Sequence, residues 1–391
     1  MTSSQGGTSR SGGARANLST PTLRPRARRV LLAIALPVTL ALLALAPVSA
    51  SGFGLSFLER LHETMPIEST VPENGDLNPY GIAVVRQNAG QLIKGNVLIS
   101  NFNNAGAEQG RGSTIVEISP QGGLSVFAQL TPKSLPAECP GGIGLSTALA
   151  ILPDNYVVVG SLPSENGQVE KAGAGCLIVL NSNGKAVSVI AGEPINGPWD
   201  MTAAPDFGQT ALFVTNVLNG TIKDGTTPND EGDVVRVVLS TYGSKIPQVT
   251  SERVIATGFE QEANSTAFVL GPTGDALGLN GSLYVADTLD NSIAAVPQAL
   301  RRTSVFEEGG TTVTTEGELN EPLGMTLAPN GDILTTNGGN GDIVETSPSG
   351  HQFEGFDTSA GPGGLFGLTI TPNEKGIYIV NDAENSLELV H

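Results

Sequence analysis

Short runs of β-branched and aromatic residues recur along the chain after Pro66, each bounded by Gly, Pro, Asn or Asp. Such runs predict β-strands, and the 3.6-residue period of an amphipathic helix is almost absent there. One run, LYVADTLDNS, leads to a polar tip at Asp287, and five other runs share this shape. The six tips are Asn101, Ser161, Asn216, Asp287, Asn337 and Asn381.

Alignment of these runs gives a repeat of four strands: an inner strand, a second strand that ends at the tip, a third strand and an outer strand. A period of roughly 40 to 60 residues indicates a propeller or a solenoid. The expected inner strands are 78–85, 141–151, 197–204, 263–270, 321–328 and 364–371. The pattern therefore predicts an all-β fold, a six-bladed β-propeller of four-stranded antiparallel blades over residues 75–391.

The sixth repeat has no outer strand after NSLELVH. Ring closure removes exposed sheet edges, so we expect a segment near Ile67 to Val71 to complete that blade, joining the N- and C-terminal strands. Before it, FGLSFLERLHETM (53–65) predicts one short amphipathic helix, whose common apolar side holds Phe53, Phe57, Leu58 and Leu61. Residues 51–74 are thus expected to form a lead-in helix and the closing strand.

The first fifty residues differ from the rest, because they hold six Arg and no acidic residue. The uncharged run at 30–48 follows Arg28–Arg29 and ends at Val48-Ser49-Ala50, which is typical of a cleaved export signal. A retained membrane anchor is the alternative, although Pro37 and Pro47 interrupt the run. We expect an exported protein, periplasmic or extracellular; the choice between general and twin-arginine export stays open.

Without those six arginines, the chain has 14 Lys and Arg against 38 Asp and Glu, a net charge of −24. Such a surface repels phosphate backbones, which excludes nucleic acid as a partner. Solubility outside the cell explains the charge, and attraction of cations is the alternative. We expect a monomer that meets no membrane beyond the N-terminal export segment.

Cys139 and Cys176 are the two cysteines of the chain. An exported protein meets an oxidising environment, so this pair favours a disulfide over a metal site or a nucleophile. Two buried free thiols are the remaining alternative.

LYVADTLDNSI (283–293) resembles the core of NHL repeats, and the chain as a whole resembles NHL-repeat and TolB-like six-bladed propellers. NPYGIAVV is in addition similar to the opening of an uncharacterised exported propeller family. The resemblance implies the fold. It leaves the function open, because propellers host hydrolases, lyases, scaffolds and sensors alike.

Similarity to gluconolactonase-type propellers would imply a divalent metal in the central channel, with one ligand just before the glycine of an inner strand. Five of the six matching residues here lack a suitable oxygen donor. These six are Tyr80, Ile143, Trp199, Thr266, Leu323 and Phe366. Asp287 and Asp200, with Asn216 and Glu321, are weak metal candidates. No cofactor is predicted, and Ca²⁺ or another divalent cation is left open.

No inner strand contains a histidine, and no G-x-S-x-G nucleophile motif or phosphate-binding glycine loop occurs, so no catalytic constellation is predicted. Tyr80 and Trp199 combine an aromatic body with a polar group. We expect them near the channel mouth, with tip residues as polar contacts: Asn101, Asn216, Asp287 and Asn337. The tips have a structural interpretation too, in which they bond to nearby backbone.

The predicted function is therefore binding of a protein partner through the loop face or of a small ligand at the channel mouth. The alternative is a metal-dependent hydrolase of the gluconolactonase-like type. A purely structural surface protein is a third possibility.

Overall fold

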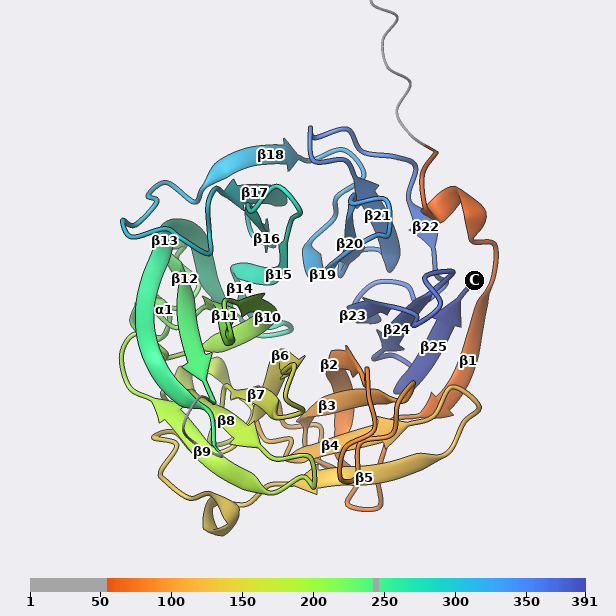
Figure 1. The fold of residues 1–391 in the computed structure, drawn as a ribbon. Helices are drawn as coiled ribbons and strands as arrows, with labels where there is room; N and C mark the ends of the chain where they lie inside the picture. The colour runs from red at the N-terminus through yellow and green to blue at the C-terminus, as the bar shows by residue number, and fades with distance from the viewer. Residues whose placement is uncertain (1–54, 242–245) are drawn as a thin grey trace, which may run out of the picture. The chain divides into compact units, whose positions relative to one another are not determined.

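Six antiparallel sheets surround a central axis in the computed structural model, which describes residues 55–241 and 246–391 (Figure 1). This confirms the predicted six-bladed β-propeller. The prediction of an export signal falls on residues 1–50, outside the described residues. Within the described residues, no helix has the length and apolar character needed to cross a bilayer.

The first three blades follow one another along the chain. Blade one contains β2 (Leu77–Val84), β3 (Val97–Asn103), β4 (Thr114–Ile118) and β5 (Leu124–Gln129). Blade two contains β6 (Leu145–Ile151), β7 (Val157–Ser161), β8 (Cys176–Leu180) and β9 (Ala186–Ala191). Blade three contains β10 (Pro198–Asp206), β11 (Gln209–Asn216), β12 (Asn229–Ser240), β13 (Gln248–Asn264) and an additional β14 (Phe268–Leu270).

The other three blades complete the ring. Blade four contains β15 (Pro272–Leu277), β16 (Leu283–Asp287), β17 (Ser292–Val296) and β18 (Thr311–Thr315). Blade five contains β19 (Pro322–Leu327), β20 (Ile333–Asn337), β21 (Asp342–Thr346) and β22 (Phe356–Asp357). Blade six contains β23 (Leu365–Ile370), β24 (Ile377–Asn381), β25 (Ser386–Val390) and β1 (Thr64–Ser69). Short helical turns lie at Leu58–Arg60, Pro132–Ser134, Val169–Lys171 and Thr221–Asp224.

Blade six is closed by β1, which pairs antiparallel with β25 so that Thr64 lies opposite Val390. The predicted closure is thus confirmed, with the strand slightly earlier than the expected 67–71. The helix expected over 53–65 is reduced in the described residues to one 3₁₀ turn at Leu58–Arg60. The apolar side chains of Phe57, Leu58 and Leu61 pack against blades five and six. The apolar spacing of this segment therefore reflects burial of these side chains and not an amphipathic helix.

Buried Glu345 fixes the segment before β1 to blade five. Its carboxylate accepts hydrogen bonds from Ser56 Oγ at 2.6 Å and from the backbone N–H groups of Phe57 and Leu58, each at 2.9 Å. Asn330, in the turn between β19 and β20, donates to the same carboxylate at 2.8 Å. Burial raises the pKa of Glu345, but these hydrogen bonds outweigh it and lower the pKa overall.

The propeller has two distinct faces, because all six inner strands run in the same direction along the axis. On the turn face lie the turns from each inner strand to the second strand and from each third strand to the outer strand. On the tip face lie the tips, the second-to-third connections and the segments that lead into the next inner strand. The glycine-rich inserts predicted between second and third strands lie on the tip face.

A hydroxyl one residue before the tip joins neighbouring blades in three places. Thr336 Oγ1 accepts the Gly324 N–H of its own blade at 2.8 Å and donates to Phe366 O of the next blade. Ser100 bridges Gly81 and Ser146 in the same way, and Thr215 bridges Asp200 and Thr273. These hydroxyls satisfy backbone groups that strand pairing within a blade leaves unpaired.

The predicted disulfide is confirmed: Cys139 and Cys176 are bonded, with their Cα atoms 5.6 Å apart. Cys139 lies in the segment that leads from blade one into blade two, and Cys176 begins β8. Both side chains are buried in the hydrophobic core between these blades. The bond therefore links the incoming segment to the body of blade two.

The inner strand of blade four differs from the prediction. Residues 263–270 were expected to form it, but Phe268–Leu270 pairs with β13 at the tip-face edge of blade three. The inner strand is β15, and Pro272 pairs with Asp287 as Pro198 pairs with Asn216 in blade three. The apolar residues at 267–270 resemble an inner strand in the sequence, but they pack into a buried aromatic cluster and do not face the axis.

Candidate functional site

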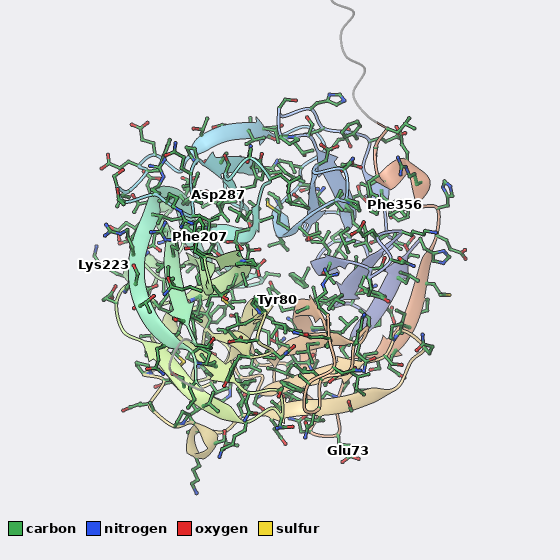
Figure 2. The ribbon with its side chains drawn as sticks, in the orientation of Figure 1. Glu73, Tyr80, Phe207, Lys223, Asp287 and Phe356 are labelled. Atoms are coloured by element: carbon green, nitrogen blue, oxygen red, sulfur yellow. A yellow bond between two sulfur atoms is a disulfide. The ribbon has the colours of Figure 1, made fainter. Side chains whose placement is uncertain are left out.

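The six inner strands line one central cavity of about 300 Å³. Figure 1 shows β2, β6, β10, β15, β19 and β23 arranged around the axis, and Figure 2 shows Tyr80 close to the centre of the ring. Backbone and apolar side chains form most of the wall. The ionisable residues among those that line it are Tyr80, Arg86, Asp200 and Asp275.

An aromatic cluster, which we call the plug, closes the cavity toward the tip face. Tyr80, Trp199 and Phe366 line the cavity, and behind them lie Phe102 and Phe268. The Tyr80 ring centroid is 4.1 Å from that of Phe366 and 5.5 Å from that of Trp199. Tyr80 and Trp199 are only 4% and 2% exposed. At the opposite end Arg86 is exposed and Thr369 half-buried, so the cavity opens on the turn face.

Asp200 lies on β10 in the middle of the cavity wall. Its Oδ1 accepts the Met201 N–H at 2.7 Å. The side chain is half-buried because it faces the hollow of the cavity, but protein surrounds it on all other sides. This burial raises the pKa of Asp200 to about 7. Its carboxyl is therefore only partly ionised near neutral pH.

Asp275 lies on the neighbouring inner strand β15 and is 2% exposed. Neither carboxylate oxygen accepts a hydrogen bond of normal geometry, although the Thr202 N–H lies near enough to oppose the shift in pKa slightly. Burial, and then the charge of Asp200, raise the pKa of Asp275 well above its ordinary value. Repulsion between two such carboxylates is mutual, so the pair holds at least one proton at neutral pH.

From the sequence, Asp200 was predicted only as a weak metal candidate, and Asp275 was not identified. The misplaced inner strand of blade four is the cause, because it put Asp275 into a turn. The sequence does contain a signal that identifies the position of Asp200 in other blades. A proline stands two residues before that position in four blades, at Pro79, Pro198, Pro272 and Pro322. After it come Gly81, Asp200, Gly274 and Gly324. This pattern places Asp275 one residue further along its inner strand than the position that Asp200 occupies in blade three.

The predicted site residues fall into two groups. Tyr80 and Trp199 line the cavity as part of the plug, whereas Asn101, Asn216, Asp287 and Asn337 do not line it. These four are almost fully buried and hydrogen-bond to backbone that leads into their own blade. Their backbone partners include Thr70 for Asn101, Gly197 for Asn216, Glu260 for Asp287 and Glu318 for Asn337. The bonds match the structural interpretation, and ligand contact by these tips stays a prediction.

Asp287, the other weak metal candidate, lies outside the cavity. Burial, and then the charge of Asp290, raise the pKa of Asp287 to about 8. Within the described residues, no three His, Cys, Asp or Glu side chains are placed to hold a metal ion together. The two weak candidates, Asp287 and Asp200, thus belong to different places, at a tip and on the cavity wall.

No family model matches the chain, and no curated protein matches it. Solved structures match over most of its length. A candidate gluconolactonase shares 16% identity over 85% of this chain and 94% of its own, with a TM-score of 0.52. Regucalcin from Agrobacterium tumefaciens strain C58, described as a calcium-binding protein, shares 13% over 83% and 94%, with a TM-score of 0.53.

A luciferin-regenerating enzyme shares 11% identity over 84% of this chain and 94% of its own, with a TM-score of 0.52. At such identities these likenesses show the propeller fold alone. The structural neighbours are gluconolactonase-like and regucalcin-like propellers, and the NHL-repeat and TolB-like resemblance stays a prediction.

Proposed function

We propose that this protein is a hydrolase whose active site is the central cavity, with Asp200 and Asp275 as its acid–base pair. The observation that carries the proposal is the placement of two buried carboxyls of raised pKa on adjacent strands of one solvent-accessible cavity. Two carboxyls whose environments favour a shared proton can supply an acid and a base to the same reaction at neutral pH.

In the proposed reaction, ionised Asp200 accepts a proton from a water molecule that attacks the carbonyl carbon of a small ester or lactone. Protonated Asp275 donates its proton to the oxygen that leaves when the C–O bond breaks. The products are an acid and an alcohol, and they leave Asp200 protonated and Asp275 ionised. Transfer of one proton from Asp200 to Asp275 then restores the starting state. The cavity volume of about 300 Å³ limits the part of the substrate that enters to a small group.

The names of the structural neighbours support this class over pure binding, since one is a candidate gluconolactonase and another a luciferin-regenerating enzyme. Regucalcin is a calcium-binding protein, which raises the question of whether this cavity could hold Ca²⁺. Ca²⁺ takes 6 to 8 oxygen ligands. The cavity wall offers two carboxylates, and Tyr80, Trp199, Leu323 and Phe366 stand just before the Gly or Asp of their strands. This donor set does not fit calcium, and no step here passes through a metal.

The test is hydrolysis of a panel of aryl esters and of γ- and δ-lactones, followed by proton release. We expect Asp275→Asn and Asp200→Asn each to lower kcat/KM at least about 100-fold, the usual contribution of a positioned acid or base. The exposed Asp154→Asn, on a turn of blade two, is the matched control and should leave the rate unchanged.

In the wild type the rate should rise with pH through about 7, where Asp200 ionises, and fall again as Asp275 loses its proton. Full activity in both Asn variants would contradict the proposal, as would activity that disappears with a chelator and returns with a divalent metal.

Binding without turnover is the second candidate, because the aromatic rings of Tyr80 and Trp199 form the closed end of the cavity. Trp199 is the single tryptophan, so its fluorescence reports on occupancy. A ligand that changes this fluorescence in the wild type without being hydrolysed would favour that candidate. A protein partner that needs the loops at 103–112 or 163–175 would favour the predicted interaction module.

A further inference from the structure

The three most exposed large apolar side chains of the described residues lie on the turn face or at its rim. Phe207 is 94% exposed, Leu279 is 93% exposed and Leu55 is 72% exposed. Ile93, in the turn from β2 to β3, is 57% exposed and lies on the same face. Phe207 and Leu279 occupy the corresponding turns of blades three and four, which are neighbours in the ring.

The turn at Phe207 is unusual in a way that folding does not explain. Phe207 has φ 46° and Gly208 has φ 80°, the geometry of a two-residue hairpin in which Asn-Gly is the favoured pair. A bulky residue is strained in this region of backbone space. The ring finds no core contact, and only the Arg301 guanidinium packs against it, 4.8 Å from the ring centroid. The turns of blades two, five and six carry Asp154, Asn330 and Asn373 instead.

Charge divides sharply between the two faces. The connections between strands on the turn face carry basic and acidic residues in equal number, and the segment before β1 adds Arg60 against Glu59 and Glu63. The basic ones are Arg86, Lys94, Lys185, Arg301, Arg302 and Lys375, and the acidic ones are Asp154, Glu307, Glu308, Asp332, Glu354 and Glu374. The connections of the tip face are strongly acidic. Their acidic residues include Glu73, Glu108, Glu138, Glu165, Glu170, Glu193, Asp290, Glu316, Glu318, Glu321 and Glu384, against Arg111, Lys133, Lys171 and Lys223.

The described chain begins at this same face. Ser56 shares the Glu345 carboxylate with Asn330 of a turn-face turn, so Leu55 lies beside that turn.

From these features we infer that the turn face docks on a lipid bilayer, with Phe207 and Leu279 inserted among the acyl chains at the headgroup boundary. Proteins that bind at a bilayer interface use exposed aromatic and aliphatic side chains next to basic ones. Anionic lipids repel the acidic tip face and so favour this orientation. The inference departs from the expectation of no membrane contact beyond the N-terminal export segment, which stays a prediction. It does not depend on hydrolysis, since it concerns a different surface and a different measurement.

The test uses a chain that begins at residue 51, which keeps every strand of the six blades, and vesicles of phosphatidylethanolamine and phosphatidylglycerol at 3:1. We expect the protein to float with the vesicles, and Phe207→Asn with Leu279→Asn to weaken partitioning at least tenfold. Ile222→Asn is the matched control, because Ile222 is an apolar residue, 40% exposed, on the tip face. It should partition as the wild type does.

Phe207→Asn should leave the unfolding midpoint unchanged or raise it, because Asn suits this turn. A wild type that stays with the soluble fraction would overturn the inference, as would a double variant that floats equally well. A wild-type dimer in light scattering that Phe207→Asn converts to monomer would also overturn it, since a second copy would then cover the face.

Discussion

Asp200 stands where the first, fourth and fifth blades have Gly81, Gly274 and Gly324. The position faces the axis, and a glycine there leaves the cavity open, whereas a carboxyl fills it with a titratable group. Asp275 stands one residue further along, where blades three and five have Met201 and Met325. Two acidic side chains at positions that other blades leave small or apolar are difficult to explain by packing, because a buried carboxyl destabilises the fold.

The stability of the protein should therefore depend on pH through Asp200. The pKa of Asp200 is raised from 3.8 to about 7 on folding, so the unfolded chain binds fewer protons between these values. Its stabilising contribution is present below about pH 4 and is lost as the pH rises to about 7. Asp200→Asn should gain roughly 2–3 kcal/mol relative to the wild type between pH 5 and pH 8, at about 1.4 kcal/mol for each pH unit up to the folded pKa. Urea unfolding at both pH values measures this.

In the same experiment Asp154→Asn, at an exposed turn, should behave as the wild type at both pH values. An equal effect of Asp200→Asn at pH 5 and pH 8 would mean that Asp200 is not buried as a carboxyl.

At this scale the sequence predicts residue types better than residue roles. The tips were found correctly as a class, and their bonds to backbone follow from the short reach of Asn, Ser and Asp side chains. Tyr80 and Trp199 were expected near the channel mouth, whereas they line the cavity at its closed end. Their burial in the plug depends on Phe102 and Phe268, which come from other strands. Contacts between residues so far apart in the chain leave no periodic signal. The proposed acid–base pair is missed for another reason, because the misplaced inner strand of blade four hides Asp275.

The strands were largely predictable from the sequence, because the period of each blade repeats and both faces of the second strands are buried. The exceptions are elements that interrupt the period. β13 runs over 17 residues, and β14 returns along it before blade four begins. Alternation alone cannot tell an apolar segment that packs on the tip-face edge from an inner strand, since both are short and apolar.

The disulfide provides a test at the scale of elements. Replacing both Cys139 and Cys176 with Ser should lower the free energy of unfolding by about 2–5 kcal/mol, because the unfolded chain regains the freedom of the closed loop. The sequence separation of 37 residues places the expected loss near 4 kcal/mol in the chain-entropy model. Thermal melting with and without a reductant provides the control. The reductant should lower the midpoint of the wild type and leave that of the double variant unchanged.

The whole ring depends on β1, because β25 would otherwise present an unpaired edge. A chain that begins at residue 70 loses β1 together with the buried side chains of Phe57, Leu58 and Leu61. We expect it to lose more than about 4 kcal/mol of stability, at roughly 1.5–3 kcal/mol for each buried side chain. It should also self-associate through the free edge, which light scattering measures.

A chain that begins at residue 55 is the control for this truncation, and we expect it to stay monomeric. A peptide of residues 55–72, added to the shorter chain, should pair with β25 and restore the monomer. A stable monomer without β1 and without the peptide would contradict the closing role of this strand.

The plug determines how molecules enter and leave the central cavity. A propeller tunnel open at both ends would let one molecule arrive while another departs. Here the rings of Tyr80, Trp199 and Phe366 block one end, so a single doorway serves both directions. A molecule bound in the cavity must leave through the turn-face opening before another can enter. Release of one molecule consequently competes with entry of the next. A second large reactant cannot reach Asp200 and Asp275 from the plug end.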